Sequence, residues 1–159
     1  MFEVGQFIVH PGQGVCRVEG VESEPYEVYK LMPLHDRHAM VIRFPIASED
    51  RLRSVCTEQE ALDLIEGYPS MDVDTYTDRS GALEEEHFKK EIKNGTCADT
   101  VRIAKTFHKR IQDVAKQNKR PPVAYERILK EARTRSLAEL AVALSTTPED
   151  IKARFEAVE

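Results

Sequence analysis

Short runs of alternating hydrophobic and polar residues fill the first third of the chain and are typical of β-strands. Residues that favour turns, such as Pro11–Gly14 and Ser23–Pro25, separate these runs. Short strands at a spacing of roughly ten residues predict a small antiparallel barrel of the SH3 or Tudor kind. The predicted strands are Phe7–His10, Gly14–Glu22, Tyr26–Met32, Met40–Ile46 and Arg51–Cys56.

Beyond residue 56 the hydrophobic positions recur every three or four residues, which predicts helices. Thr57–Glu60 has the form of a capping box, and Gly67 ends a short helix that we expect to close the barrel. Further helices are predicted over 82–94, from Thr96 to about Asn118, after Lys119–Pro122, and from Thr147 onward. The predicted class is therefore α+β, with a β-barrel domain over 1–68, a linker over 69–80 and an all-α helical domain over 81–159.

Charge is distributed unevenly along the 159 residues, although the net charge is only -5. Residues 1–70 contain 12 acidic and 6 basic side chains, whereas residues 89–135 contain 14 basic and 5 acidic ones. This asymmetry indicates two units with different partners, and the basic unit suits contact with phosphate groups. The candidate phosphate ligands lie at three- and four-residue steps on two predicted helices: Arg102, Lys105 and Lys109 on one, Arg127, Lys130 and Arg133 on the other.

Composition excludes several classes of protein. No hydrophobic run approaches the ~18 residues that cross a bilayer, and the N-terminus lacks the features of a signal peptide, so we expect a cytoplasmic protein without membrane contact. The 3 cysteines are odd in number and far apart, which argues against a disulfide framework. We also expect the free protein to be a monomer.

Two groups of residues could carry other chemistry. His35 and His38 could bind zinc with Cys16 or Cys56, but no Cys-x-x-Cys motif accompanies them, and a polar turn explains both histidines. Cys16 and His10 could form a nucleophilic pair, yet no orienting carboxylate is evident. We therefore predict no metal, no cofactor and no enzymatic activity; a cysteine- or metal-dependent enzyme is the weakest hypothesis.

Several motifs resemble the CarD/CdnL family of bacterial RNA polymerase-binding transcription regulators, whose first domain also occurs in transcription-repair coupling factors. The similar segments are Phe2–Val15, Met40–Pro45, Lys93–Gly95, Ala132–Arg133 and Glu139–Ala141. The resemblance implies a Tudor-like domain that docks on the polymerase β-subunit lobe. It also implies a helical domain that contacts promoter DNA near the upstream edge of the transcription bubble. The positive charge of the helical part suits phosphate contact without base readout.

The resemblance also suggests which residues contact the polymerase. Arg43 stands where the family has an arginine in the strand that faces the polymerase. On an alternating strand Arg43 shares a face with Val41 and Pro45, opposite Met40, Ile42 and Phe44. We therefore predict that Val41, Arg43 and Pro45 form the polymerase contact.

One family feature is missing from this chain. Family members insert a tryptophan at the upstream edge of the bubble, and the corresponding position here is Gly81, in a chain with no tryptophan. We therefore expect poor bubble stabilisation, with Tyr76 in the linker as the candidate substitute. The resulting hypothesis is a regulator that modulates open-complex stability; the alternative is an interaction module whose basic helices bind RNA or an acidic protein.

Overall fold

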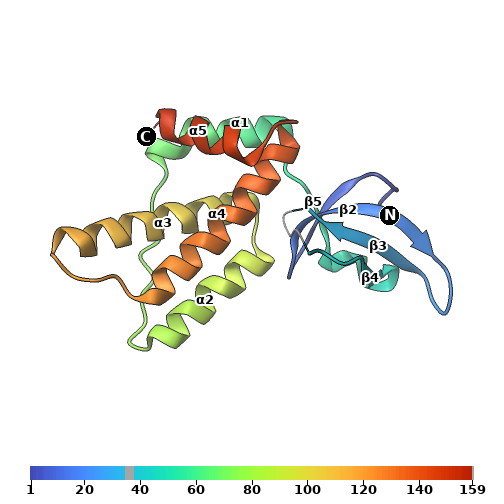
Figure 1. Cartoon of the computed structure of the whole chain (residues 1–159), viewed down its shortest axis with the longest axis horizontal. Coiled ribbons are helices and arrows are strands. Elements are labelled where there is room, and N and C mark those ends of the chain that lie inside the picture. The colour runs from blue at the N-terminus through green and yellow to red at the C-terminus, as the bar shows by residue number, and fades with distance from the viewer. Residues whose placement is uncertain (35–37, 159) are drawn as a thin grey trace.

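The computed structural model describes residues 1–34 and 38–158, and Figure 1 shows a sheet on one side and a group of helices on the other. The strands are β1 (Phe7–His10), β2 (Gly14–Glu22), β3 (Val28–Pro33), β4 (Ile42–Pro45) and β5 (Arg53–Ser54). The helices are α1 (Glu58–Gly67), α2 (Gly81–Asn94), α3 (Cys97–Lys116), α4 (Val123–Ala143) and α5 (Pro148–Val158), with two short 3₁₀ helices, η1 (Ile46–Arg51) and η2 (Tyr68–Ser70).

The strands form one antiparallel sheet in the order β4-β3-β2-β1-β5. A tight connection joins β1 to β2, where His10 lies opposite Gly14. Gly14 has a φ of 75°, a backbone conformation that glycine adopts without steric cost. Alternate side chains of the sheet pack with Leu52 into one hydrophobic core, whose buried members are Ile8, Cys16, Val18, Tyr29, Leu31, Phe44 and Leu52.

The α+β class predicted from the sequence is confirmed. In the described pairings β4 and β5 occupy the two ends of the sheet, and each pairs with one strand only. Closure of the strands into a Tudor- or SH3-like barrel therefore stays a prediction. The first two strands have the predicted bounds, and β3 begins and ends later than predicted. The last two strands are shorter than predicted at both ends, and η1 over residues 46–51 accounts for the end of β4 and the start of β5.

The helices begin where the sequence predicts caps. Thr57 and Thr96 each form a capping box, with Glu60 and Asp99 as the respective partners. Helices α2, α3 and α4 enclose a core made of Phe88, Ile92, Ile103, Phe107, Ile128 and Ala132. In the part of the chain that the structure describes, no helix has the length and hydrophobicity needed to cross a membrane.

Helix α1 packs differently from our expectation. Its buried residues Ala61 and Ile65 contact a cluster from α3, α4 and α5 that includes Val101, Leu140 and Ile151. Figure 1 shows α1 beside α5, at the end of the helical group. The helix therefore covers other helices and does not close the sheet. The division into domains at residue 68 stays a prediction.

Candidate functional site

Strand β4 is an edge strand, because it pairs with β3 alone. Its Arg43 side chain is 51% exposed and donates a hydrogen bond to the Glu24 carbonyl oxygen. The same guanidinium lies 3.0 Å from a carboxylate oxygen of Glu22. An edge strand with an exposed arginine leaves backbone groups and a positive charge available to a partner.

The predicted alternation of faces around Arg43 is only partly observed. Phe44 is buried and Ile42 packs against the sheet core, as an inward face requires, and Val41 is exposed beside Arg43. Met40 was predicted to face inward with them, yet it is 81% exposed. The reason is that β4 begins at Ile42, so Met40 precedes the paired strand and does not follow its alternation. Pro45, the last residue of β4, is half-buried.

The basic side chains of α3 contact the connection between α1 and α2. Lys105 Nζ donates hydrogen bonds to the carbonyl oxygens of Tyr68, Pro69 and Met71, at 2.6, 3.2 and 2.7 Å. Arg102 forms ion pairs with three carboxylates. We predicted that this face of α3 meets water or phosphate, but its first two cations hold a neighbouring segment in place. The carboxylates paired with Arg102 are those of Asp74, Glu91 and Asp99.

Arg110, which the sequence did not single out, is the most enclosed cation of this group. It donates a hydrogen bond of 2.7 Å to Glu84 and one of 2.6 Å to the Tyr76 carbonyl oxygen. Its guanidinium also lies over the rings of Phe88 and Phe107. Phe88, a buried core residue, thus supports an arginine that joins α3 to α2 and to the preceding segment.

Lys109 and Lys130 are the predicted cations with the greatest freedom. Both are exposed, and neither forms an ion pair within residues 1–34 and 38–158. Lys109 lies on α3 and Lys130 on α4, so each of the two predicted basic stripes includes a lysine that is available to an external partner. These two lysines are the positions best placed for contact with phosphate.

The basic stripe predicted on α4 does not lie on a single surface. Arg127 and Lys130 line one hollow, together with Gly12 from the β1–β2 connection. Arg133 lines another hollow and lies 3.5 Å from the His108 ring nitrogen. A step of three residues turns the side-chain direction by 300° around an α-helix. Arg133, six residues after Arg127, therefore lies on a different side of α4. Arg127 is also paired with Glu85, at 2.9 Å.

Tyr76 is not free in the segment that precedes α2. Its ring stacks on His87 with a centroid distance of 3.7 Å, and its hydroxyl donates a hydrogen bond to Asp78. The ring also packs edge-on against Phe88. Movement toward a DNA groove would require Tyr76 to leave this stack. Gly81, by contrast, is exposed as the first residue of α2, and a side chain there would enter open space.

A polar contact that the sequence did not reveal joins the sheet to the helices. Arg53 on β5 donates hydrogen bonds of 2.8 and 2.6 Å to the carboxylate of Glu139 on α4, and another to the Gly95 carbonyl oxygen. Arg135 donates one of 2.6 Å to the carbonyl oxygen of Pro11. Arg53 and Glu139 are 86 positions apart, so no local pattern could indicate their pairing.

The cysteine and histidine candidates show no sign of nucleophilic chemistry. Cys16 lies in the sheet core, and burial raises the pKa of its thiol to about 12, so the thiolate is scarce at neutral pH. His10 Nδ1 accepts hydrogen bonds from the backbone N–H groups of Gly12 and Gln13. His35, which the sequence pairs with His38 as a candidate zinc site, lies outside the described residues.

The family comparison bears on the sheet part of the chain. An antiparallel sheet with an open edge and an exposed charge is typical of a protein-interaction module. Residues 2–56 match the CarD-like/TRCF RID domain, a non-enzymatic domain that interacts with RNA polymerase. The chain therefore contains a CarD-like/TRCF RID domain over residues 2–56, and the resemblance seen in the sequence is confirmed for that part. No curated protein matches the chain.

Proposed function

We propose that this protein docks on the β-subunit lobe of RNA polymerase through strand β4, with Val41, Arg43 and Pro45 in the contact. The observation that carries the proposal is that the polymerase-interacting domain at residues 2–56 has β4 at its open edge. A strand of the partner could extend the sheet there by backbone hydrogen bonds. Arg43 would then add a charge contact that specifies the partner.

The test compares two arginines of similar exposure on the same sheet. Arg43 on β4 is 51% exposed and Arg17 on β2 is 50% exposed, and each is paired with a glutamate. We expect Arg43→Glu to weaken binding of the full chain to core polymerase by about tenfold or more, because it reverses a charge at the interface. Arg17→Glu is the control and should bind as the wild type does. Equal binding by Arg43→Glu and wild type would contradict the docking strand.

We also propose that the helical part contacts promoter DNA non-specifically near the upstream edge of the transcription bubble. Exposed Lys109 and Lys130 supply the first contacts, with Arg127 in the same hollow as Lys130 and Arg133 in another, whereas Arg102 and Lys105 act by holding the segment over α3. Binding should be weak, independent of sequence and steeply lost between about 50 and 200 mM salt, because phosphate contacts release counterions. Competition between duplex DNA and RNA distinguishes this role from an RNA- or acidic-protein-binding module.

The third part of the proposal is that the protein modulates open-complex stability but stabilises the bubble poorly. An aromatic wedge at a base step offsets the cost of unstacking, which glycine at position 81 cannot do. We expect Gly81→Trp to lengthen open-complex lifetime by about tenfold at fixed promoter and salt. The exposed position of Gly81 allows the substitution without a clash. Tyr76→Ala is the comparison. If the wild type strongly prolongs the open complex and Tyr76→Ala prolongs it equally, the result contradicts both the effect of the missing tryptophan and the role of Tyr76 as its substitute.

A further inference from the structure

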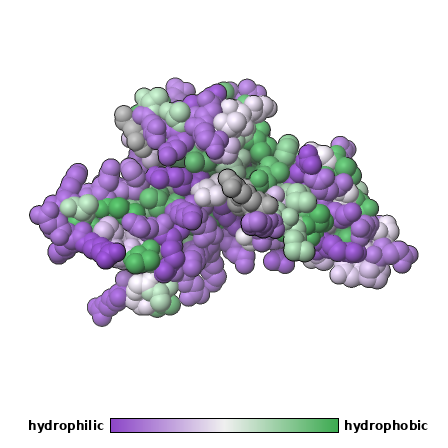
Figure 2. Space-filling model, in the orientation of Figure 1, coloured by the Kyte–Doolittle hydropathy of each residue, from purple (hydrophilic) through white to green (hydrophobic). Residues whose placement is uncertain are grey.

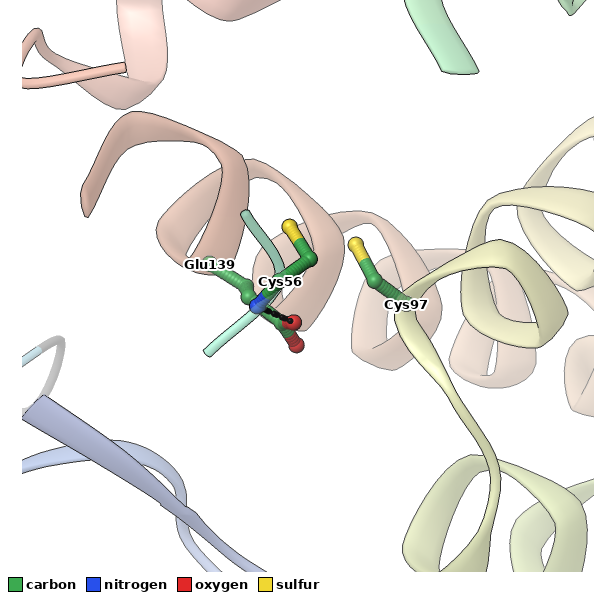
Figure 3. A group of neighbouring side chains, drawn as sticks. All are labelled: Cys56, Cys97 and Glu139. Atoms are coloured by element: carbon green, nitrogen blue, oxygen red, sulfur yellow. Dashed lines mark hydrogen bonds between the residues drawn. The ribbon is translucent and has the colours of Figure 1, made fainter. Parts of the chain in front are cut away.

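Two cysteines that are 41 positions apart in the chain meet where the β5–α1 connection passes the beginning of α3. Their Sγ atoms and a carboxylate oxygen of Glu139 all lie within 4.8 Å of one another. Figure 3 shows the two sulfur atoms next to each other, with the carboxylate of Glu139 against the backbone nitrogen of Cys56, from which it accepts a hydrogen bond.

The two cysteines lie in the wall of a cavity. Cys56 and Cys97 both line a cavity of about 870 Å³, whose other walls come from α1, the residues after it and the start of α3. Cys56 is half-buried, whereas Cys97 is almost fully buried. Figure 2 shows hydrophobic side chains gathered where the helices meet the sheet. A small uncharged or amphipathic reagent therefore has space beside both thiols.

The same three side chains form a poor metal site. A structural zinc ion takes four ligands in a tetrahedron, and only three are present among the described residues. Both carboxylate oxygens of Glu139 already accept hydrogen bonds from the Arg53 guanidinium, and one also accepts from the Cys56 backbone N–H. A cation at Glu139 would have to displace Arg53. The chemistry of this group is therefore that of a dithiol.

We propose that Cys56 and Cys97 form a reversible intramolecular disulfide by exchange with a low-molecular-weight disulfide. A disulfide bond is about 2.05 Å long, so the two sulfur atoms need to approach by no more than ~2.8 Å from their present separation. Cys16, the remaining cysteine, lies in the sheet core and belongs to another cluster. The reaction is thus confined to one pair of thiols.

The burial of the two thiols sets the order of the steps. The neighbouring Cys56 side chain and burial raise the pKa of Cys97, so Cys97 stays protonated while the more exposed Cys56 reacts first. The Cys56 thiolate attacks one sulfur of the small disulfide, forms a mixed disulfide and releases one small thiolate, which takes the proton that Cys56 lost. Cys97 then loses its proton, its thiolate attacks the Cys56 sulfur, and the second small thiolate leaves and takes up that proton. The protein loses two electrons and two protons, and the small disulfide becomes two thiols.

The bond would stabilise the place where the sheet joins the helices. Arg53, three residues before Cys56, donates hydrogen bonds to Glu139 and to the Gly95 carbonyl oxygen, two residues before Cys97. A covalent link at Cys56 and Cys97 would close the intervening loop, which includes α1 and α2, and would restrict the unfolded chain. Oxidation therefore fixes the β5–α1 connection against α3.

The experiment equilibrates the full chain with glutathione buffers of increasing oxidised fraction, followed by unfolding and alkylation of free thiols. We expect the number of alkylated cysteines to fall from three to one, with a peptide that links Cys56 to Cys97 and with full reversal by excess reduced glutathione. Oxidation should raise the melting temperature by roughly 5–10 °C. Cys56→Ser and Cys97→Ser should each abolish the two-thiol loss, and Cys16→Ala, the control, should retain it.

Three results would overturn the proposal. The first is the absence of the Cys56–Cys97 link at every glutathione ratio in folded protein. The second is a link that involves Cys16 or a second copy of the chain. The third is protection of both thiols by one equivalent of zinc, because the group would then be a metal site. Should Cys97→Ser fail to fold, the half-buried Cys56 allows the same test with Cys56→Ser alone.

Discussion

The edge strand of the sheet and helix α3 both carry arginines paired with carboxylates, but they place these charges differently. Arg43 on β4 is half-exposed, and its pair with Glu22 lies at an open edge that a partner can reach. Arg110 on α3 is only 16% exposed and contacts Glu84, which is itself buried. The comparison shows that a basic residue in the sequence can serve an external partner or the fold itself, and that the surroundings decide which.

The largest expected effect is on the inward-facing cations. Arg110→Ala removes the partner of buried Glu84 and the hydrogen bonds to the segment before α2. We expect a loss of about 3 kcal/mol in the free energy of unfolding, measured by urea denaturation, because an uncompensated buried charge remains. Arg127→Ala is the matched control: its pair with Glu85 involves an arginine that is 58% exposed and should contribute less than about 1 kcal/mol. Equal losses in the two variants would contradict the distinction.

A smaller difference in the free energy of unfolding is expected between variants of Lys105 and Lys109, two lysines of α3. Lys105→Met removes three hydrogen bonds to backbone carbonyl oxygens and should cost about 2 kcal/mol of unfolding free energy. Lys109→Met should change stability by less than about 0.5 kcal/mol, since Lys109 is exposed.

For DNA binding, we expect the larger effect from Lys109→Met and the smaller one from Lys105→Met. Lys109→Met should flatten the dependence of log affinity on log salt by about one unit, whereas Lys105→Met should leave that slope unchanged. The two lysines therefore test, in one helix, whether exposure identifies the contacts with phosphate. A flatter slope in Lys105→Met alone would show that the hydrogen-bonded face also reaches DNA.

The smallest effect is a pH dependence. Hydrogen bonds from Arg127, and secondarily from Lys89, lower the pKa of Glu85 below its ordinary value of 4.5. A carboxyl group whose pKa is lowered by folding stabilises the protein above its unfolded pKa and loses that contribution as the pH falls through its folded pKa. The stability difference between wild type and Arg127→Ala should therefore be largest near neutral pH and shrink below about pH 4. A difference that grows on acidification would contradict this pairing.

Local patterns predicted much of the fold. Strands β1 and β2 have the predicted bounds, and the capping boxes at Thr57 and Thr96 start helices where expected. Each of these features depends on residues within a few positions of one another, so a short window of sequence contains the whole signal. The polymerase-interacting domain was also recognisable from its opening residues, and the family match at 2–56 confirms it.

Contacts between distant residues were not predictable in the same way. The packing of α1 on α5, the role of Lys105 and the place of Tyr76 all depend on which helices lie beside one another. The assignment of Arg102 and Lys105 to phosphate rested on charge periodicity alone, which cannot show that a neighbouring segment supplies carbonyl and carboxylate oxygens.

By itself, then, the sequence determined the strand and helix order, the caps, the uneven charge and the family of the N-terminal part. Only the tertiary structure decided that β4 is an edge, that Arg110 faces inward while Lys109 faces out, and that Cys56 meets Cys97. The physical reason is that hydrophobic periodicity and capping act over one or two turns of chain, whereas ion pairs, edges and thiol contacts depend on distances in space between segments far apart in sequence.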